Sequence, residues 1–195
     1  MIKKLKELVV TKQHLVFDFD LTIAKMNIDW SQWHEGVEKI YTKIDPNIVY
    51  DGLAKQDPHH FYNLMAEKHG TELVEIMKDF NQKYEDEHLL GFTPYQDLID
   101  FIVSAKTKNR YVYSSNSRKT VEKGLTSLGI INEFDQIISR DDVSLVKPSP
   151  EGFYTLPKFL ENKNQFLMIG DSNSDQEAAK TAGVDFIRCE YFFTQ

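Results

Sequence analysis

The sequence predicts an α/β protein built on a doubly wound parallel sheet, with a small all-α domain inserted near its N-terminal end. Three observations predict this fold. A short apolar stretch near the N-terminus ends in two acids, the region 27–90 carries only helical patterns, and the rest of the chain alternates strand and helix patterns. Strands that alternate with helices form parallel sheets that are covered on both faces.

Residues 14–20 predict a buried strand, because an apolar run of strand length is bounded by polar residues. The end of this strand carries Asp18 and Asp20. Open α/β sheets bind ligands at the carboxyl ends of their strands. Functional groups are therefore expected after this strand and after its neighbours in the sheet.

The region 27–90 predicts a bundle of three or four helices and no strand. Apolar residues recur at helical spacing over 30–41, and again over 71–88, where charged residues occupy the opposite face. Asp followed by Pro suits a helix start, and Gly suits a helix end. The expected starts are Asp45-Pro46 and Asp57-Pro58, and the expected end is Gly70.

The region from Pro94 to Arg188 predicts four further strands and the helices between them. The expected strands are 110–114, 134–139, 165–170 and 184–188. The expected helices are 94–106, 118–128, 150–161 and 175–182.

Composition excludes several classes of function. The formal net charge of −7 repels nucleic acid, and no strong Lys/Arg cluster offsets that field. No stretch reaches the ~18 apolar residues that a membrane helix needs. Residues 1–10 predict a short helical lead-in rather than a signal peptide, so we expect a cytoplasmic protein. The single cysteine, Cys189, excludes an internal disulfide, and we expect no chemical role for it.

Two pairs of acids carry the strongest chemical signal. Asp18 and Asp20 alone would fit a solvated turn, and Asp175 alone would fit an acid at a helix N-terminus. Asp171, however, follows the strand that ends near Gly170, so it lies on the same edge of the sheet as Asp18. Hard oxygen ligands brought together in this way suit Mg²⁺, which binds one or two carboxylates together with a phosphate.

Two weaker signals lie on the same edge. Ser115-Asn116 follows a predicted strand, and its hydroxyl and backbone N–H groups could hold a phosphate oxygen, although a plain turn also fits. Lys147-Pro148 precedes a predicted helix, and this lysine could reach the acids or could be an ordinary surface residue.

Together the four motifs resemble those of the haloacid dehalogenase (HAD) superfamily, in order and in spacing, over about residues 15–187. The matching segments are Asp18-x-Asp20-x-Thr22, Ser115, Lys147-Pro148 and Gly170-Asp171-x-x-x-Asp175. The resemblance implies a Rossmann-like core of residues 1–24 and 91–195 and an all-α cap domain of residues 25–90. One departure is Leu21, where the family usually has Gly, which puts the local geometry in question.

The resemblance also implies a mechanism and a role for each matching residue. It implies that Asp18 attacks phosphorus and that Mg²⁺ binds Asp18, the backbone carbonyl of Asp20, and Asp171. Asp20 would act as the general acid and base. The remaining implied roles belong to Ser115 and Asn116 as phosphate-binding residues, Lys147 as the balancing cation, and Thr22 and Asp175 as supporting residues.

The expected function is Mg²⁺-dependent hydrolysis of a small phosphorylated metabolite through an aspartyl-phosphate. Three alternatives stay open: a sugar-phosphate mutase or phosphotransferase, a catalytically silent binding protein on the same fold, and a response-regulator receiver. A receiver fits worst. In receivers the lysine comes late in the sequence, after the phosphorylated acid and the hydroxyl, whereas here Lys147 precedes Asp171. The sequence does not specify an oligomeric state. Candidate cap contacts to the substrate are Lys25, Trp30, Trp33, Tyr50, Lys55, His59 and His60.

Overall fold

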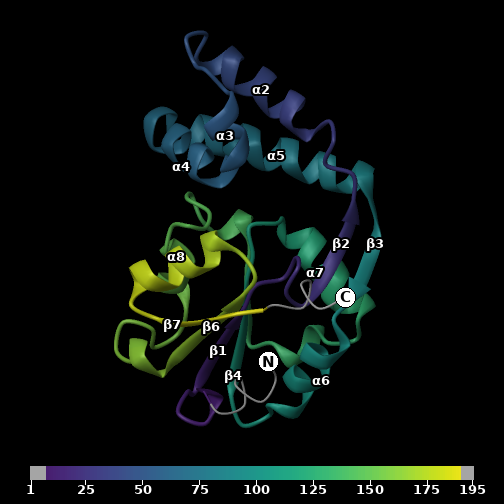
Figure 1. The fold of residues 1–195 in the computed structure, drawn as a ribbon, viewed down its shortest axis with the longest axis vertical. Helices are drawn as coiled ribbons and strands as arrows, with labels where there is room; N and C mark the ends of the chain where they lie inside the picture. The colour runs from purple at the N-terminus through teal and green to yellow at the C-terminus, as the bar shows by residue number, and fades with distance from the viewer. Residues whose placement is uncertain (1–7, 190–195) are drawn as a thin grey trace.

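The computed structural model describes residues 8–189. Its core is a five-stranded, all-parallel sheet in the order β5-β4-β1-β6-β7, which confirms the predicted α/β class (Figure 1). The strands are β1 His14–Phe17, β4 Asn109–Tyr113, β5 Gln136–Ile138, β6 Phe166–Gly170 and β7 Asp185–Arg188. The helices that connect them are α6 Gln96–Ser104, α7 Arg118–Ser127 and α8 Asn173–Ala182.

The central strand, β1, is apolar on both faces, as a strand covered from both sides must be. Leu15 and Phe17 point into a cluster with α6 and α7, whereas Val16 points into a second cluster with α8. Phe17 lies opposite Val112 of β4 and Ile169 of β6 in the register of the sheet. The carboxyl ends of these three strands therefore meet at one edge.

A helical layer stands over that edge of the sheet (Figure 1). It consists of α2 Trp33–Ile44, the short α3 Gly52–Gln56, α4 Pro58–His69 and α5 Thr71–His88. Asp57 caps α4 by accepting a hydrogen bond from the backbone N–H of His60 at 3.2 Å, and Pro58 occupies the first turn, as predicted. The helices α2 to α5 together form the cap.

A two-stranded antiparallel ribbon joins the cap to the sheet domain (Figure 1). It pairs β2 Ala24–Ile28 with β3 Leu89–Pro94. The prediction of no strand in 27–90 was therefore wrong at both ends of that region. Both strands are short. β2 alternates apolar and polar residues over only five positions, and β3 shows no such alternation, so the pattern is too brief to stand out from its helical surroundings.

Two predicted helices differ in the structure. No helix begins at Pro46, because Asp45 instead ends α2, where its N–H bonds to the carbonyl of Tyr41. The predicted helix 150–161 is only a short 3₁₀ segment, Glu151–Thr155, followed by turns. Pro157 lies inside the predicted span and cannot continue a helix, and the residue before it, Leu156, is extended in the structure, as a residue before proline usually is.

Most of the predicted N-terminal lead-in, residues 1–7, lies outside the described residues. Between residues 8 and 189, no helix has both the length and the apolar character needed to cross a membrane.

Candidate active site

The chemistry-bearing residues come together at the carboxyl edge of the sheet. Asp18 directly follows β1, Asp171 directly follows β6, and Ser115 is the second residue after β4. Lys147 lies in the loop region that follows β5. Adjacent parallel strands end side by side, so residues more than 100 positions apart in sequence become neighbours.

Lys147 is the buried cation of the site, with a side chain only 4% exposed. Its Nζ donates to Asp18 Oδ1 at 2.6 Å, to Asp175 Oδ1 at 2.5 Å and to the carbonyl of Tyr113 at 2.9 Å. Burial alone would lower the pKa of Lys147, but the two carboxylates outweigh burial and raise that pKa above its ordinary value. Lys147 is therefore a permanent positive charge against Asp18.

Asp175 holds Lys147 in place rather than facing the cavity. It is fully buried, and its Oδ2 accepts from the N–H and the hydroxyl of Ser172 at 3.0 and 2.7 Å, forming a capping box at the start of α8. Gly170 makes room for it, because a Cβ at that position would lie 2.5 Å from Asp175 Oδ2. With Oδ1 bonded to Lys147, both carboxylate oxygens of Asp175 are occupied.

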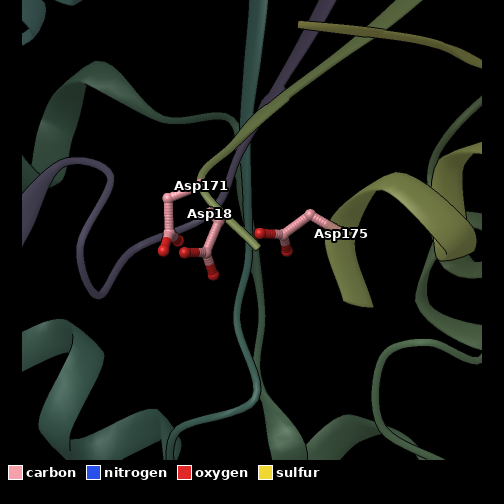
Figure 2. A group of neighbouring side chains, drawn as sticks. All are labelled: Asp18, Asp171 and Asp175. Carbon is pink, nitrogen blue, oxygen red and sulfur yellow. The ribbon is translucent and has the colours of Figure 1, made fainter. Parts of the chain in front are cut away.

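Three carboxylates converge at this point. Ligand oxygens of Asp18, Asp171 and Asp175 all lie within 4.8 Å of one another (Figure 2). Burial raises the pKa of Asp18, although Lys147 opposes that shift, and burial followed by Asp175 raises the pKa of Asp171. A cation beside these groups would favour their ionised forms.

The donor set fits Mg²⁺. Because Asp175 is occupied by Lys147 and Ser172, the carboxylates left to bind a cation are those of Asp18 and Asp171. Thr22 steadies Asp171 by donating its hydroxyl to Oδ1 at 3.3 Å. Two carboxylates, with room for waters and a phosphate, match the ligand set that Mg²⁺ prefers.

Asp20 lies at the same cavity, where the chain turns away from the sheet into the ribbon. Its Oδ1 accepts the backbone N–H of Met26 at 2.7 Å, which fixes the carboxyl group. Burial raises the pKa of Asp20 to about 6. A carboxyl group with such a pKa exchanges a proton near neutral pH.

Leu21, between the two acids, has a positive φ of 59°. This is the left-handed region, which glycine adopts without strain and leucine does not. The turn therefore keeps the backbone conformation that a Gly would favour, although the residue is Leu.

Ser115 and Asn116 differ in how ready they are for a ligand. The hydroxyl of Ser115 is buried and has no hydrogen-bond partner within residues 8–189. The N–H of Asn116 instead donates to Ser114 Oγ at 3.1 Å, closing a tight turn. The Ser115 hydroxyl is thus available for a phosphate oxygen, whereas the Asn116 N–H would first have to exchange partners.

These residues line one cavity of about 320 Å³ between the sheet edge and the cap. Three of the candidate cap residues, Trp30, Trp33 and His59, line it. Tyr50 packs against Tyr41 inside the cap, and Lys55 pairs with Glu38 on its surface. The remaining candidates, Lys25 and His60, are exposed and are not among the lining residues.

Sequence reasoning missed Arg140 and Glu85. Arg140 lines the cavity and follows β5 by two residues, so the rule that placed Ser115 after β4 would have found it. Glu85 lies on α5 and is fully buried, where its Oε1 accepts Arg140 Nη2 at 2.8 Å. Nothing in the helical pattern of α5 distinguishes this glutamate from its exposed neighbours.

Comparison with known proteins decides the family. The model of the haloacid dehalogenase-like hydrolase family matches residues 15–189, which is most of the chain. The chain belongs to this family. The match confirms the resemblance carried by the four motifs, and members of the family are enzymes of the hydrolase class.

One curated relative of the family is pyrophosphatase PpaX from Bacillus thuringiensis, which is 28% identical over 128 residues. That match covers 64% of this chain and 58% of the relative, so the chain matches less than two thirds of the relative's length.

Solved structures of the family share the fold. A protein from Haemophilus somnus, described as a predicted phosphoglycolate phosphatase, superposes with a TM-score of 0.62 at 21% identity, covering 93% of this chain and 86% of that one. The HAD-hydrolase YfnB from Bacillus subtilis, solved bound to magnesium, gives a TM-score of 0.54 at 22% identity, covering 94% and 89%.

Proposed function

We propose that this protein is a Mg²⁺-dependent phosphatase that hydrolyses a small phosphomonoester through an aspartyl-phosphate on Asp18. One observation carries the proposal. A nearly buried carboxylate at the end of the central strand is bonded to a buried lysine and clustered with Asp171, beside an unpartnered hydroxyl, in one cavity. The relatives described as pyrophosphatase PpaX and as a phosphoglycolate phosphatase support phosphoryl chemistry.

In the first step, Asp18 attacks phosphorus with the oxygen that Lys147 does not hold. The hydrogen bond from Lys147 to Oδ1 fixes the carboxylate and offsets negative charge as the phosphoryl group approaches. The hydroxyl of Ser115 would hold a phosphoryl oxygen, and the N–H of Asn116 would join it after releasing Ser114. Covalent capture divides one difficult displacement into two easier ones.

Asp18, Asp171 and the backbone carbonyl of Asp20 would hold Mg²⁺, with Thr22 and Asp175 in support. When bound, the ion would supply positive charge to the phosphoryl oxygens, which is the main need of a phosphoryl-transfer transition state. This assignment is supported by the carboxylate cluster and its donor chemistry.

Asp20 would donate a proton to the leaving oxygen and then take one from the water that cleaves the acyl-phosphate. Its carboxyl group is fixed by Met26 and its pKa is near 6, so both protonation states are accessible. The domain division proposed from the sequence, a core of 1–24 and 91–195 with a cap of 25–90, would place the leaving group under the cap.

A phosphate-release assay over small phosphomonoesters tests the proposal. We expect release with Mg²⁺, its loss with EDTA and its recovery on adding Mg²⁺ back. The Asp18→Asn variant should lose at least about 10³-fold in kcat, because an amide cannot serve as the nucleophile. The matched control is Asp29→Asn at an acid outside the cavity. Normal turnover by Asp18→Asn, or by the chelated enzyme, would refute the proposal.

A further inference from the structure

The guanidinium of Arg140 is anchored at two of its nitrogens and free at the third. Nε donates to the carbonyl of Ser115 at 2.8 Å, and Nη2 donates to Glu85 Oε1 at 2.8 Å. Nη1 is buried and has no hydrogen-bond partner within residues 8–189. The side chain is only 9% exposed, so water does not readily satisfy this nitrogen.

The free nitrogen belongs to a side chain that lines two adjoining cavities. One is the active-site cavity, and the other is a smaller branch of about 30 Å³ under the cap. Asp18 and Lys147 line only the first cavity. The residues that line both are Trp33, Pro58, His59, Ser115 and Arg140. The branch therefore continues from Ser115 away from the nucleophile and toward the cap, which is the side expected for a leaving group.

The surroundings hold the guanidinium rigidly. Glu85 is fully buried, and its Oε2 also accepts the hydroxyl of Ser117 at 2.5 Å, so the carboxylate cannot rotate freely toward Nη1. The guanidinium is planar, and Glu85 and the Ser115 carbonyl fix its Nη2 and Nε. The position of Nη1 is therefore set before any ligand binds. Such preorganisation reduces the cost of binding.

Arg140 is the one charged side chain among the described residues that line the branch. His59 is half-buried there, and desolvation lowers its pKa to about 4, with Arg140 and Lys147 contributing more than Asp57 and Asp175 oppose. The imidazole is therefore neutral near pH 7 and adds no charge of its own. An anionic oxygen is favoured over a cation in these surroundings.

We propose that Arg140 sets the substrate preference of the enzyme by binding, through Nη1, a carboxylate on the leaving group of the phosphomonoester. This inference rests on the proposed phosphatase function. At about 30 Å³ the branch is about a tenth of the size of the active-site cavity of about 320 Å³, so a compact, planar carboxylate fits it more readily than a second phosphate. Arginine pairs with carboxylates through strong, charge-assisted hydrogen bonds.

The test compares phosphorylated hydroxy acids of two and three carbons with their isosteric amides. We expect the intact enzyme to favour the acid by about 10- to 100-fold in kcat/KM, the effect of one charge-assisted hydrogen bond. In Arg140→Gln the ratio of acid to amide should fall to about one, and in Arg140→Lys it should lie between. A ratio of two rates from the same sample does not depend on how much of the variant is folded.

The matched control is Lys119→Gln, which removes an exposed cation paired with Asp86 and should leave the ratio unchanged. An intact enzyme that hydrolyses acid and amide equally, or an Arg140→Gln variant that keeps the full preference, would overturn the inference. Faster turnover of the corresponding bisphosphate than of the acid would overturn the choice of carboxylate. No hydrolysis of any phosphomonoester would instead refute the proposed function itself.

Discussion

At the scale of single residues, the site depends on side chains whose neighbours leave them little freedom. Asp175 uses both oxygens to hold Lys147 and Ser172, and Gly170 is needed because any side chain there would collide with Asp175. Lys147 in turn fixes Asp18. A nucleophile held in this way needs little reorganisation during the reaction.

Leu21 offers a test of local strain. Its φ of 59° is costly for leucine, so Leu21→Gly should be more stable than Leu21→Ala by about 1 kcal/mol. Both substitutions remove the side chain, and only glycine relieves the backbone. Urea unfolding of the two variants measures the difference. If the alanine variant proved the more stable, the turn would not hold Leu21 in the left-handed conformation.

At the scale of elements, α4 of the cap is tied to the loop that delivers Lys147. Asn63 donates its amide to the carbonyl of Val146 at 2.7 Å and accepts the N–H of Val146 at 3.0 Å. Tyr62, its neighbour on α4, donates to the carbonyl of Ser144 at 3.0 Å. The backbone immediately before Lys147 is therefore tied to the cap, in addition to the bonds that Glu151 accepts from the N–H groups of Ser144 and Leu145.

Asn63→Ala should leave the buried N–H of Val146 unpaired, while the carbonyl of Val146 keeps only its bond from the N–H of Ser149. We expect it to destabilise the protein by about 1–3 kcal/mol and to lower kcat, because the loop carrying Lys147 loses its support. Unfolding and phosphate-release assays measure the two effects. Leu64→Ala, at the next position of α4 but 51% exposed, is the control. A stable, fully active Asn63→Ala variant would show that the pairing with Val146 is dispensable.

The same elements show how far sequence alone predicts the fold and where it stops. The order of strands and helices in the sheet domain follows from apolar periodicity, and α5 begins and ends at the predicted residues, Thr71 and His88. The ribbon β2–β3 was missed because its pairing joins residues about 65 positions apart, and only β2, over five residues, shows a local alternation of apolar and polar residues. The helix expected over 150–161 was wrong because Pro157 lies within that span and the residue before it is extended.

The sequence predicted those site residues that lie just after strands or in the loops at the carboxyl edge of the sheet. Asp18, Asp20, Ser115, Asn116, Lys147 and Asp171 all line the cavity. Three features of the site could not be predicted, because they depend on how side chains pack in the folded protein. Both oxygens of Asp175 are occupied, Asn116 bonds to Ser114, and Glu85 is buried. Such packing carries no periodic signal in the sequence.

At the scale of the whole molecule, buried polar contacts join the cap to the sheet domain. The main contact is Glu85 of α5, which bonds to Arg140 and to Ser117 at the start of α7. Both members of the ion pair are nine-tenths buried or more. Breaking one side of such a pair is far more costly than the net stability that the intact pair provides, because the other charge stays buried.

Glu85→Ala should therefore destabilise the protein by about 3–5 kcal/mol, since Arg140 would lose its buried counter-ion. The adjacent Asp86→Ala breaks only the exposed pair with Lys119 and should cost about 1 kcal/mol or less. Denaturant unfolding of the two neighbouring variants gives the comparison. Equal losses would mean that the buried pair does not join the cap to the sheet domain as the structure indicates.

The central claim is that Asp18 becomes phosphorylated during turnover, and chemical trapping tests it most directly. The Asp20→Asn variant with acetyl phosphate and Mg²⁺ should accumulate the intermediate, because acetate leaves without a proton donor while hydrolysis lacks its base. Acid quenching and borohydride reduction should then convert Asp18, and no other aspartate, to homoserine, as read by peptide mass spectrometry. Conversion of another residue, or turnover by the intact enzyme with no modification of Asp18 under these trapping conditions, would contradict the mechanism.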